Sequence, residues 1–376
     1  MVTVREATAA DNDALIALDR QCTMGEAMTL AFDRAPDFFA RHKVYERWTA
    51  LVAEAPDGAP VGTGSMALKT LLVGGRPVEA AYLMDLRVHP DWRRRGVGRA
   101  IGDALRDRLI KAAPAFAYLM VLKGNEPSLS FVRNRGVYTS LGKVTLPVLV
   151  PEDLPALPTG IEVRPLAAED MPWLAERWEA CTAGWSLALP LEAGGIERLV
   201  AERLEVPPDD RLVVLDEGAP IGAAALWDYS RIMSITFVRL PEEIDRRLSP
   251  SLRARLGGGE PFRLYYPLPL VWRSLEDLPA ITAALLTYLA DKHAGEQSAT
   301  TLWVPLDSAG PMASLVAPKA AGLPIPQAAT TGRSSAKNSS SSLEISGSAR
   351  STWLLPSRLT RRAPDTSAAR SRPPCS

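Results

Sequence analysis

The first 150 residues alternate between stretches with strand-like and helix-like spacing of apolar positions. Between 99 and 111 the apolar residues fall on one helical face and the charged ones on the other, which predicts an amphipathic helix from about Arg99. The mostly apolar run 80–88 ahead of it predicts a strand buried on at least one face. Further strands are expected near 2–5, 49–54, 60–72 and 118–122, and further helices near 11–20 and 36–42.

The turn between the strand 80–88 and the helix from Arg99 is rich in arginine and glycine. Gly96 and Gly98 have no Cβ, so the backbone can approach an anion closely. The first-turn amides of a helix have no intrahelical acceptor, and the helix dipole favours a negative charge beside them. Arginines 93–95 and Arg99 add bidentate donors. The turn therefore predicts a pyrophosphate site.

Two familiar nucleotide loops fit this turn less well. A Walker A loop needs a lysine and a hydroxyl after its glycines, and neither is present. Gly96, Gly98 and Gly102 form GxGxxxG, a weak relative of the Rossmann pattern. A Rossmann loop belongs to a first βαβ unit, whereas this one lies about ninety residues into the chain, and no acidic residue is placed for a ribose after the run 113–122.

The pattern that fits is RxxGxG, here R-R-R-G-V-G at 93–98. With D-L-R-V-H-P-D-W at 85–92, N-x-x-S-x-x-F at 125–131 and R-G-V at 135–137, residues 1–150 resemble the GNAT superfamily of acyl-CoA-dependent N-acyltransferases. The resemblance implies an α+β fold, in which a mixed, mostly antiparallel twisted sheet is flanked by helices. It also implies acetyl-CoA as the donor, direct attack of an amine on the thioester, and no metal.

The resemblance assigns a donor site to these motifs. The amides 94–99 would hold the coenzyme A pyrophosphate, with Arg93 at the start of the loop. The backbone of Leu86 and Val88 would pair with the pantetheine arm like an added strand, in a gap where strand 118–122 splays away. The following helix would touch the same arm. The residues assigned to the donor are Leu86, Arg87, Val88, Arg93, Arg94, Arg95, Gly96, Val97, Gly98, Arg99, Ala100, Asn125 and Ser128.

The acid and the base are less well marked. The tyrosine that often serves as the acid in the family falls at Val132, which has no proton to donate, and Tyr138 lies near but displaced. Asp85 is the candidate for a base or an anchor of the substrate amine, or else it pairs with Arg87 or with a neighbouring strand. Tyr82 takes another position where relatives often have glutamate.

The other polar candidates are weaker. His89 precedes Pro90 and is expected to be a turn residue, while His42 and His293 lie in charged helical contexts and are expected to be solvated. Glu26 and the segment 34–41 are the candidates for acceptor specificity, because that region overlies the thioester in relatives.

The chain repeats itself. V-T-V-R-E-A-T-A-A-D at 2–11 aligns with I-E-V-R-P-L-A-A-E-D at 161–170, and G-A-P-V-G at 58–62 aligns with G-A-P-I-G at 218–222. We expect a GNAT-like catalytic domain over 1–150, a linker over 151–160 and a second, degenerate GNAT-like domain over 161–331. Its strand 263–272 runs into a helix with no glycine pair between them, so the copy is expected to complete the structure and wall the acceptor pocket.

Six of the nine tryptophans lie in the second half. An aromatic acceptor pocket is one interpretation, and packing in the core is the favoured one. The six are Trp173, Trp178, Trp185, Trp227, Trp272 and Trp303.

Composition sets further limits. Residues 332–376 carry a serine run and little apolar periodicity, so this basic tail is expected to be disordered or to be read in a non-native frame. Cys22, Cys181 and Cys375 show no metal or disulfide spacing and are expected to be free thiols. No apolar run approaches ~20 residues and no signal segment is visible, which favours the cytoplasm over a membrane.

Two classes of function stay open at this stage. The first is an N-acetyltransferase that acts on a small-molecule or peptidyl amine. The second is a CoA-binding sensor or scaffold without catalysis. Nucleic acid is a minor alternative, because a chain with 43 basic and 43 acidic residues offers no basic stripe. A homodimer is a possible assembly.

Overall fold

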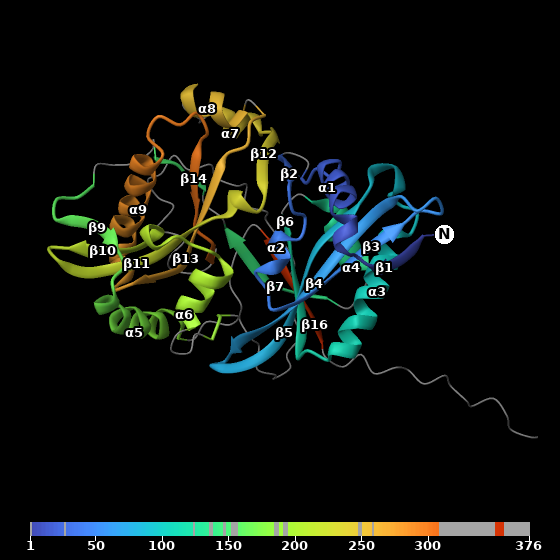
Figure 1. The fold of residues 1–376 in the computed structure, drawn as a ribbon, viewed down its shortest axis with the longest axis horizontal. Coiled ribbons are helices and arrows are strands. Elements are labelled where there is room, and N and C mark those ends of the chain that lie inside the picture. The colour runs from blue at the N-terminus through green and yellow to red at the C-terminus, as the bar shows by residue number, and fades with distance from the viewer. Residues whose placement is uncertain are drawn as a thin grey trace, which may run out of the picture.

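The computed structural model describes residues 2–25, 28–122, 125–134, 138–145, 148–151, 157–183, 188–190, 195–246, 250–257, 259–307 and 350–356. They form an eight-stranded sheet, a six-stranded sheet and a two-stranded ribbon. The two large sheets lie side by side, with the N-terminal part of the chain in one and the later part in the other (Figure 1).

The first sheet follows the predicted order. The strands β1, β3, β4 and β5 are antiparallel neighbours in this order, and β5 pairs in parallel with β6. The helices of this half are α1 (Asn12–Arg20), α2 (Ala40–Lys43), α3 (Val97–Ala112) and α4 (Glu126–Asn134). The strands in spatial order are β1 (Thr3–Glu6), β3 (Arg47–Glu54), β4 (Pro60–Val73), β5 (Arg76–Val88), β6 (Phe116–Leu122), β16 (Arg350–Pro356), β7 (Thr139–Thr145) and β15 (Leu306–Asp307).

Helix α3 packs closely on this sheet because glycines leave room for it. Its buried residues, Val97, Ile101, Leu105 and Leu109, recur every four positions and face the strands. A Cβ on Gly62 of β4 would lie 2.8 Å from a Val97 methyl carbon, which is too close for two carbon atoms. The helix begins two residues before the predicted start at Arg99.

The second sheet repeats the topology of the first. The order β9-β10-β11-β13-β14 matches β1-β3-β4-β5-β6, including the single parallel pair at β13 and β14. Helices α5 (Met171–Thr182) and α9 (Leu278–Lys292) take the places of α1 and α3, α6 (Gly195–Glu197) leads into the helical turn Arg198–Arg203 near the position equivalent to α2, and α7 (Glu242–Asp245) and α8 (Pro250–Gly257) lie between β12 and β13. The strands are β8 (Val148–Leu149), β14 (Thr300–Trp303), β13 (Arg263–Trp272), β11 (Ala219–Asp228), β10 (Arg211–Asp216) and β9 (Ile161–Pro165).

Individual contacts recur in the two halves. Arg5 forms a two-pronged ion pair with Asp11, and Arg164 does the same with Asp170, 159 positions later (164 − 5 = 159). A thiol donates to the last residue of an equivalent strand in each half, from Cys22 to Val88 O and from Cys181 to Trp272 O. Sequence repeat, topology and contacts therefore agree on duplication. Cys22 and Cys181 are free thiols as predicted, and Cys375 lies outside the described residues.

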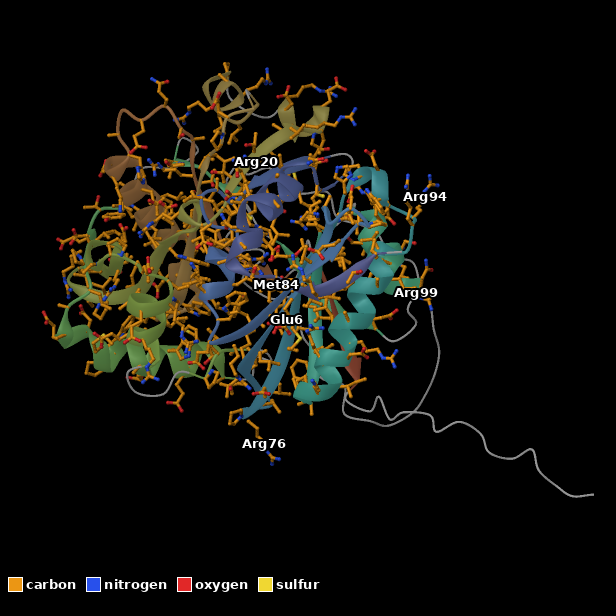
Figure 2. All side chains as sticks on the ribbon, turned by 45° about the vertical axis from the view of Figure 1, so that its right-hand side comes forward. Glu6, Arg20, Arg76, Met84, Arg94 and Arg99 are labelled. Atoms are coloured by element: carbon orange, nitrogen blue, oxygen red, sulfur yellow. The ribbon has the colours of Figure 1, made fainter. Side chains whose placement is uncertain are left out.

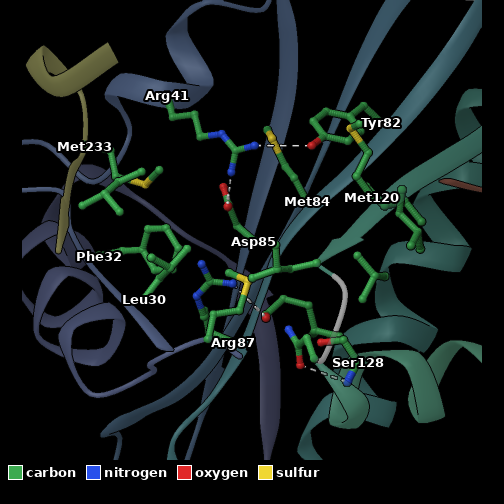
Figure 3. A pocket seen from close by; sticks show the side chains of 18 of the residues that line it. Leu30, Phe32, Arg41, Tyr82, Met84, Asp85, Arg87, Met120, Ser128 and Met233 are labelled. Atoms are coloured by element: carbon green, nitrogen blue, oxygen red, sulfur yellow. Dashed lines mark hydrogen bonds and ion pairs between the residues drawn. The ribbon is translucent and has the colours of Figure 1, made fainter. Parts of the chain in front are cut away.

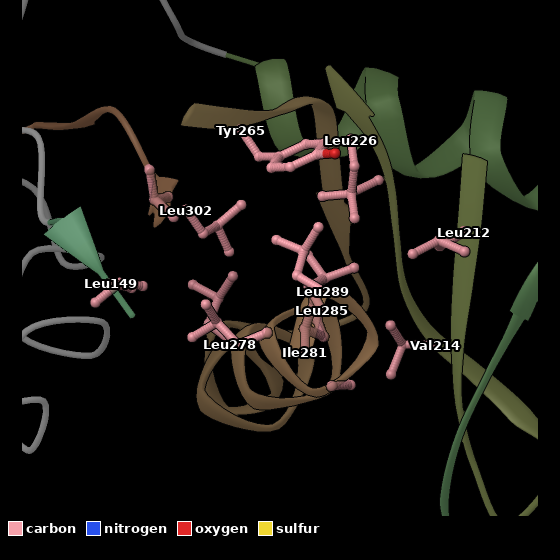
Figure 4. Close-up of a cluster of buried hydrophobic side chains, with 14 of the residues drawn as sticks. Leu149, Leu212, Val214, Leu226, Tyr265, Leu278, Ile281, Leu285, Leu289 and Leu302 are labelled. Atoms are coloured by element: carbon pink, nitrogen blue, oxygen red, sulfur yellow. The ribbon is translucent and has the colours of Figure 1, made fainter. Parts of the chain in front are cut away.

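The second half has its own apolar core. The α9 residues Ile281, Leu285 and Leu289 are buried against β-strand residues such as Leu212 and Leu226 (Figure 4). Trp272 belongs to this core, which agrees with the packing interpretation for that tryptophan. Trp185 lies outside the described residues.

The halves are joined by strands that the sequence did not reveal. β2 (Thr29–Asp33) of the first half pairs antiparallel with β12 (Ser234–Arg239) of the second. β8, which precedes the expected linker 151–160, is an edge strand of the second sheet, where it pairs with β14. The two halves therefore share both a ribbon and a sheet.

The tail departs from the prediction at one place. Residues 350–356 form β16, which pairs with β6 and with β7 in the first sheet. The expected disorder of 332–376 is wrong for these seven residues, because the run S-T-W-L-L is rich in residues that favour strands and meets two available strand edges. The ranges 308–349 and 357–376 lie outside the described residues, and the prediction stays open there.

Candidate active site

Strands β5 and β6 diverge in the middle of the first sheet. Their parallel pairing runs from Ala80 and Phe116 to Leu83 and Leu119 and then stops. The next residues of β5 turn an unpaired edge toward β6, and a cavity opens between the two strands. A substrate arm can pair with such an edge as an added strand.

A bulge at Asp85 sets the side-chain directions in this cavity. Asp85 has a positive φ of 58°, and the register between β4 and β5 shifts between Thr63 and Ser65. Leu86 and Val88 consequently pack against the α3 core. Asp85 and Arg87 instead meet residues of α1 and of the β2–α2 segment.

Asp85 lies in a buried cluster of ion pairs, of which Figure 3 shows the pair with Arg41. Its Oδ1 accepts from Arg34 Nη2 at 2.7 Å and from Arg41 Nη1 at 2.5 Å. Asp19 of α1 pairs with Arg34 Nε at 3.2 Å and with Arg87 Nε at 3.0 Å. The side chains of both aspartates and of Arg34 are at most 1% exposed. Asp85 pairs with Arg34 and Arg41, and not with Arg87 as the sequence suggested.

This environment keeps Asp85 ionised. Burial alone would raise its pKa, but the positive charges of Arg34 and Arg41 outweigh burial and hold the pKa well below the usual range. A carboxylate with so little affinity for a proton is a poor general base. The carboxylate of Asp85 pairs with Arg41, whose side chain lines the cavity.

His42 is buried, which contradicts the expected solvation. Its side chain is 0% exposed, and Nε2 lies 2.8 Å from Ser65 Oγ. The charged residues of its short helix favoured a solvated histidine. The His42 side chain instead faces the ring of Phe38 and the sheet, while that of Lys43 is exposed. His293 is also mostly enclosed, between Tyr265 Oη and Glu296. His89 does sit at the strand end as expected, where Nδ1 accepts from Asp91 N.

Burial lowers the pKa of His42 from 6.5 to about 4. The unfolded chain therefore takes up a proton below pH 6.5 that the folded chain refuses until about pH 4, so the free energy of unfolding should fall over this window by about 3 kcal/mol. Urea unfolding at pH 7 and 4.5 measures this, and His42→Gln should lose that part of the pH dependence. His89→Gln is the control. An equal pH dependence in wild type and His42→Gln would contradict the assignment.

The arginine–glycine turn lies next to the cavity. Gly96 has φ 84° and caps α3, which begins at Val97, and Arg94 also has a positive φ of 60°. The side chains of Arg94 and Arg99 reach the outer surface (Figure 2). A Cβ on Gly98 would lie 3.8 Å from the ring of Phe131, which lines the cavity. Through Phe131 the start of α3 therefore adjoins the gap between the strands.

Helix α4 lines the cavity opposite β5. Asn125 and Ser128, both assigned to the donor by the sequence, face the cavity, and Asn125 Oδ1 accepts from Ser128 N at 3.4 Å. Val132 lies in the same wall and is buried. Tyr138, the displaced candidate for the acid, also lines the cavity. A phenol is therefore present even though Val132 replaces the usual tyrosine.

The second half closes the cavity on its other side. Met233 and the β12 residues Ile235 and Phe237 line it together with Leu30 and Phe32 of β2. Tyr229, Tyr266 and Trp303 complete this wall. The expectation that the second half walls the pocket agrees with this arrangement. Trp303 lines the cavity and also belongs to a buried core cluster, so its position fits both interpretations of the tryptophans. Of the acceptor candidates, Arg41 lines the cavity, whereas Glu26 lies outside the described residues.

Residues 13–137 match the family model described as Acetyltransferase (GNAT) family. The match lies entirely within the first half of the chain. Among solved structures, a tandem GNAT protein from the clavulanic acid biosynthesis pathway aligns with 95% of this chain and 99% of its own, at 15% identity and a TM-score of 0.56. Saccharomyces cerevisiae N-myristoyltransferase with bound myristoyl-CoA aligns with 94% and 82%, at 12% identity and a TM-score of 0.54. No curated protein matches the chain.

A third similar structure is the glucosamine N-acetyltransferase region of a fungal multi-domain GH3 β-N-acetylglucosaminidase. It aligns with 81% of this chain and 36% of its own, at 14% identity and a TM-score of 0.53. At these identities the likeness concerns the fold. Two tandem GNAT-like halves of the α+β class are therefore confirmed, and over residues 13–137 the family model agrees with the family that the sequence motifs indicated.

The second GNAT-like half lacks the features of a donor site in its described residues. The segment after β13 is a short 3-10 helix, Leu275–Asp277, that leads into α9. Asp277 accepts from Ser274 N at 3.0 Å and pairs with Arg273, so a carboxylate of the chain itself occupies the helix N-terminus. An incoming phosphate would meet this negative charge. The GNAT donor features are therefore confined, over the described ranges, to the first half.

Two further observations concern other classes of site. None of the described helices is both long and apolar enough to cross a membrane. In the part of the chain that the structure describes, no group of three or more His, Cys, Asp or Glu side chains is placed to hold a metal ion.

Proposed function

We propose that the first half binds acetyl-CoA and transfers its acetyl group to the primary amine of a small molecule or peptide. The observation that carries this proposal is the divergence of β5 and β6, which opens a cavity between the two strands beside helix α3. The GNAT family match supports acyl transfer from coenzyme A to an acceptor. Acetyl as the acyl group, the amine and a cytoplasmic location are parts of the proposal.

In this proposal the donor lies across the first sheet. The amides from Arg94 to Gly98 hold the pyrophosphate, with Arg93 at the start of the loop and the guanidinium groups around it. The free edge at Leu86 and Val88 pairs with the pantetheine arm. The remaining donor contacts come from Arg87, Arg95, Gly96, Val97, Arg99, Ala100, Asn125 and Ser128.

The acceptor enters from the side that the second half covers. Its neutral amine attacks the thioester carbonyl, so a C–N bond forms and the C–S bond then breaks. The amine loses one proton and the leaving thiolate gains one. Asp85, ion-paired on both sides, is proposed to hold Arg41 in place and not to accept that proton. Tyr138 is proposed as the acid that protonates the thiolate.

Replacing Tyr138 with phenylalanine tests the acid. We expect kcat to fall by about 100- to 10,000-fold, the range of general acid catalysis, while the Kd for acetyl-CoA stays unchanged. The high-pH limb of the rate profile should also flatten. Tyr288→Phe is a matched control, because Tyr288 hydrogen-bonds Asp210 in the second half and does not line the cavity. A wild-type kcat in Tyr138→Phe would remove this residue from the mechanism.

A CoA-binding sensor without catalysis is the second candidate, favoured by Val132 at the position of the usual tyrosine. Thiol release from acetyl-CoA across a panel of amines separates the two. Turnover in the wild type supports the enzyme. Tight binding of CoA with no thiol release for any amine supports the sensor.

A further inference from the structure

The arginines in the buried cluster outnumber the carboxylates. Arg34, Arg41 and Arg87 face only Asp19 and Asp85, which leaves one positive charge (3 − 2 = 1). His42 adds a neighbour 3.6 Å from Asp85 Oδ2, but its lowered pKa keeps it neutral near pH 7. A buried charge without a counter-charge is costly, so an anion that completes the cluster would be stabilised.

The surplus charge faces the cavity. Arg41 and Arg87 line it, and their side chains are 15% and 12% exposed, whereas Arg34 is fully enclosed. Arg41 reaches Asp85 with Nη1, but its Nη2 has only a long 3.3 Å contact to Tyr82 Oη (Figure 3). Asp85 is the one carboxylate among the described residues that line the cavity, and its Oδ1 already accepts from two guanidinium groups.

The opposite wall offers a second donor. Trp303, from β14 of the second half, lines the cavity and is 6% exposed. Its indole Nε1 has no hydrogen-bond partner among the described residues. A buried N–H without an acceptor is costly and suits a ligand oxygen. Two elements far apart in the sequence thus bring N–H donors to the wall of one cavity: Arg41, which has one long hydrogen bond to Tyr82, and Trp303, whose Nε1 has no partner among the described residues.

The rest of the wall is apolar and polarizable. Met84, Met120 and Met233 lie around it together with Phe32 and Tyr229. Thioethers and aromatic rings suit an apolar body, and they adapt to its shape. The wall therefore combines a cationic donor group with an apolar surface, which is the complement of an amphiphilic anion.

We propose that the acceptor is an amine that also carries a carboxylate on an apolar body, as an aromatic or aliphatic amino acid does, and that Arg41 binds this carboxylate. The inference rests on the proposed acetyl transfer and narrows its acceptor. With the acceptor carboxylate bound, the cluster contains three positive and three negative charges. The anionic group is assigned to the acceptor and not to the acyl group. β5 and β6 are still paired at Leu83 and Leu119, so the gap between the strands is closed there.

Matched amines test this proposal in the full-length chain with acetyl-CoA. We expect kcat/KM for phenylalanine to exceed that for phenylalaninamide and for phenethylamine by about 10- to 100-fold, the value of a hydrogen bond to a charged group. Arg41→Gln should remove this preference mainly through KM, and Arg41→Lys should restore part of it. Arg108→Gln is the control, because Arg108 of α3 pairs with Glu6 of β1 and does not line the cavity. Equal use of all three amines would overturn the proposal.

Two further arms separate the possible failures. With coenzyme A bound, 3-phenylpropionate should change the tryptophan fluorescence while 3-phenylpropanol should not, and Arg41→Gln should lose the response; this arm needs no turnover. Phenylpropionate that fails to bind although coenzyme A binds overturns the acceptor, whereas coenzyme A that fails to bind overturns the proposed function itself. If succinyl-CoA is preferred over butyryl-CoA with phenethylamine as the acceptor, the bound anion is part of the acyl group. That result would also overturn the proposal.

Discussion

Gly98→Trp is expected to abolish acetyl-CoA binding, whereas Gly98→Ala is expected to leave it intact. A Cβ at position 98 would lie 3.7 Å from Val88 and 3.8 Å from Phe131, which is ordinary contact. Alanine therefore fits, but an indole must enter the space between the helix N-terminus and the cavity. The Kd should rise by more than about 100-fold, because several charge-assisted hydrogen bonds to phosphate are lost together.

Calorimetric titration with acetyl-CoA measures this difference, and thermal melting checks that each variant is folded. The alanine variant is the matched control for any loss of helix glycine, since alanine is the better helix former. A folded Gly98→Trp protein that binds acetyl-CoA as the wild type does would place the donor elsewhere on the chain.

Asp85→Asn should cost far more stability than the loss of an exposed carboxylate. Removing this charge leaves Arg34 and Arg41 facing each other inside the protein, and breaking such a buried pair costs about 3–5 kcal/mol of unfolding free energy. Turnover should also fall, because Arg41 loses the partner that positions it. Urea unfolding at pH 7 gives the first quantity and thiol release the second.

The control for this change is Asp33→Asn. Asp33 pairs with Arg20 at 2.8 Å, but both side chains are largely exposed, so its loss should cost about 0–1 kcal/mol. Adding Arg34→Met to Asp85→Asn should recover part of the lost stability, because it removes one of the stranded charges. A loss below about 1 kcal/mol in Asp85→Asn would contradict the cluster.

The donor half of the site could be predicted from local sequence patterns. The glycines and arginines at 93–98 and the helix after them are contiguous in sequence, so their spacing reports their structure directly. The duplication was also visible, because short motifs kept their order and spacing. The end of strand β13 at Trp272 agrees with the prediction to the residue.

Contacts between distant segments could not be predicted in the same way. The partners of Asp85 come from residues 34 and 41, in a segment with little periodicity, and the bulge that turns Asp85 toward them has no sequence signal of its own. One sequence feature does indicate this buried cluster. Asp19 follows Leu15 and Ile16 on the apolar face of α1, where a carboxylate requires a buried partner.

The acceptor wall depends on contacts between the halves. β2 and β12 are short strands 205 positions apart (234 − 29 = 205), and each is incomplete without the other. Hydrophobic spacing identifies an apolar face that must be buried, but it does not show which segment buries it. Only the fold shows that Phe237 and Trp303 meet the cavity of the first half.

Amide hydrogen exchange with and without acetyl-CoA tests the central claim most directly, namely one donor site between diverging strands in the first half. We expect acetyl-CoA to slow exchange over 84–88, 94–100 and 120–131. The equivalent second-half segment, 268–280, should be unaffected. Protection at 268–280, or no protection at 94–100 when acetyl-CoA is bound, would contradict the account.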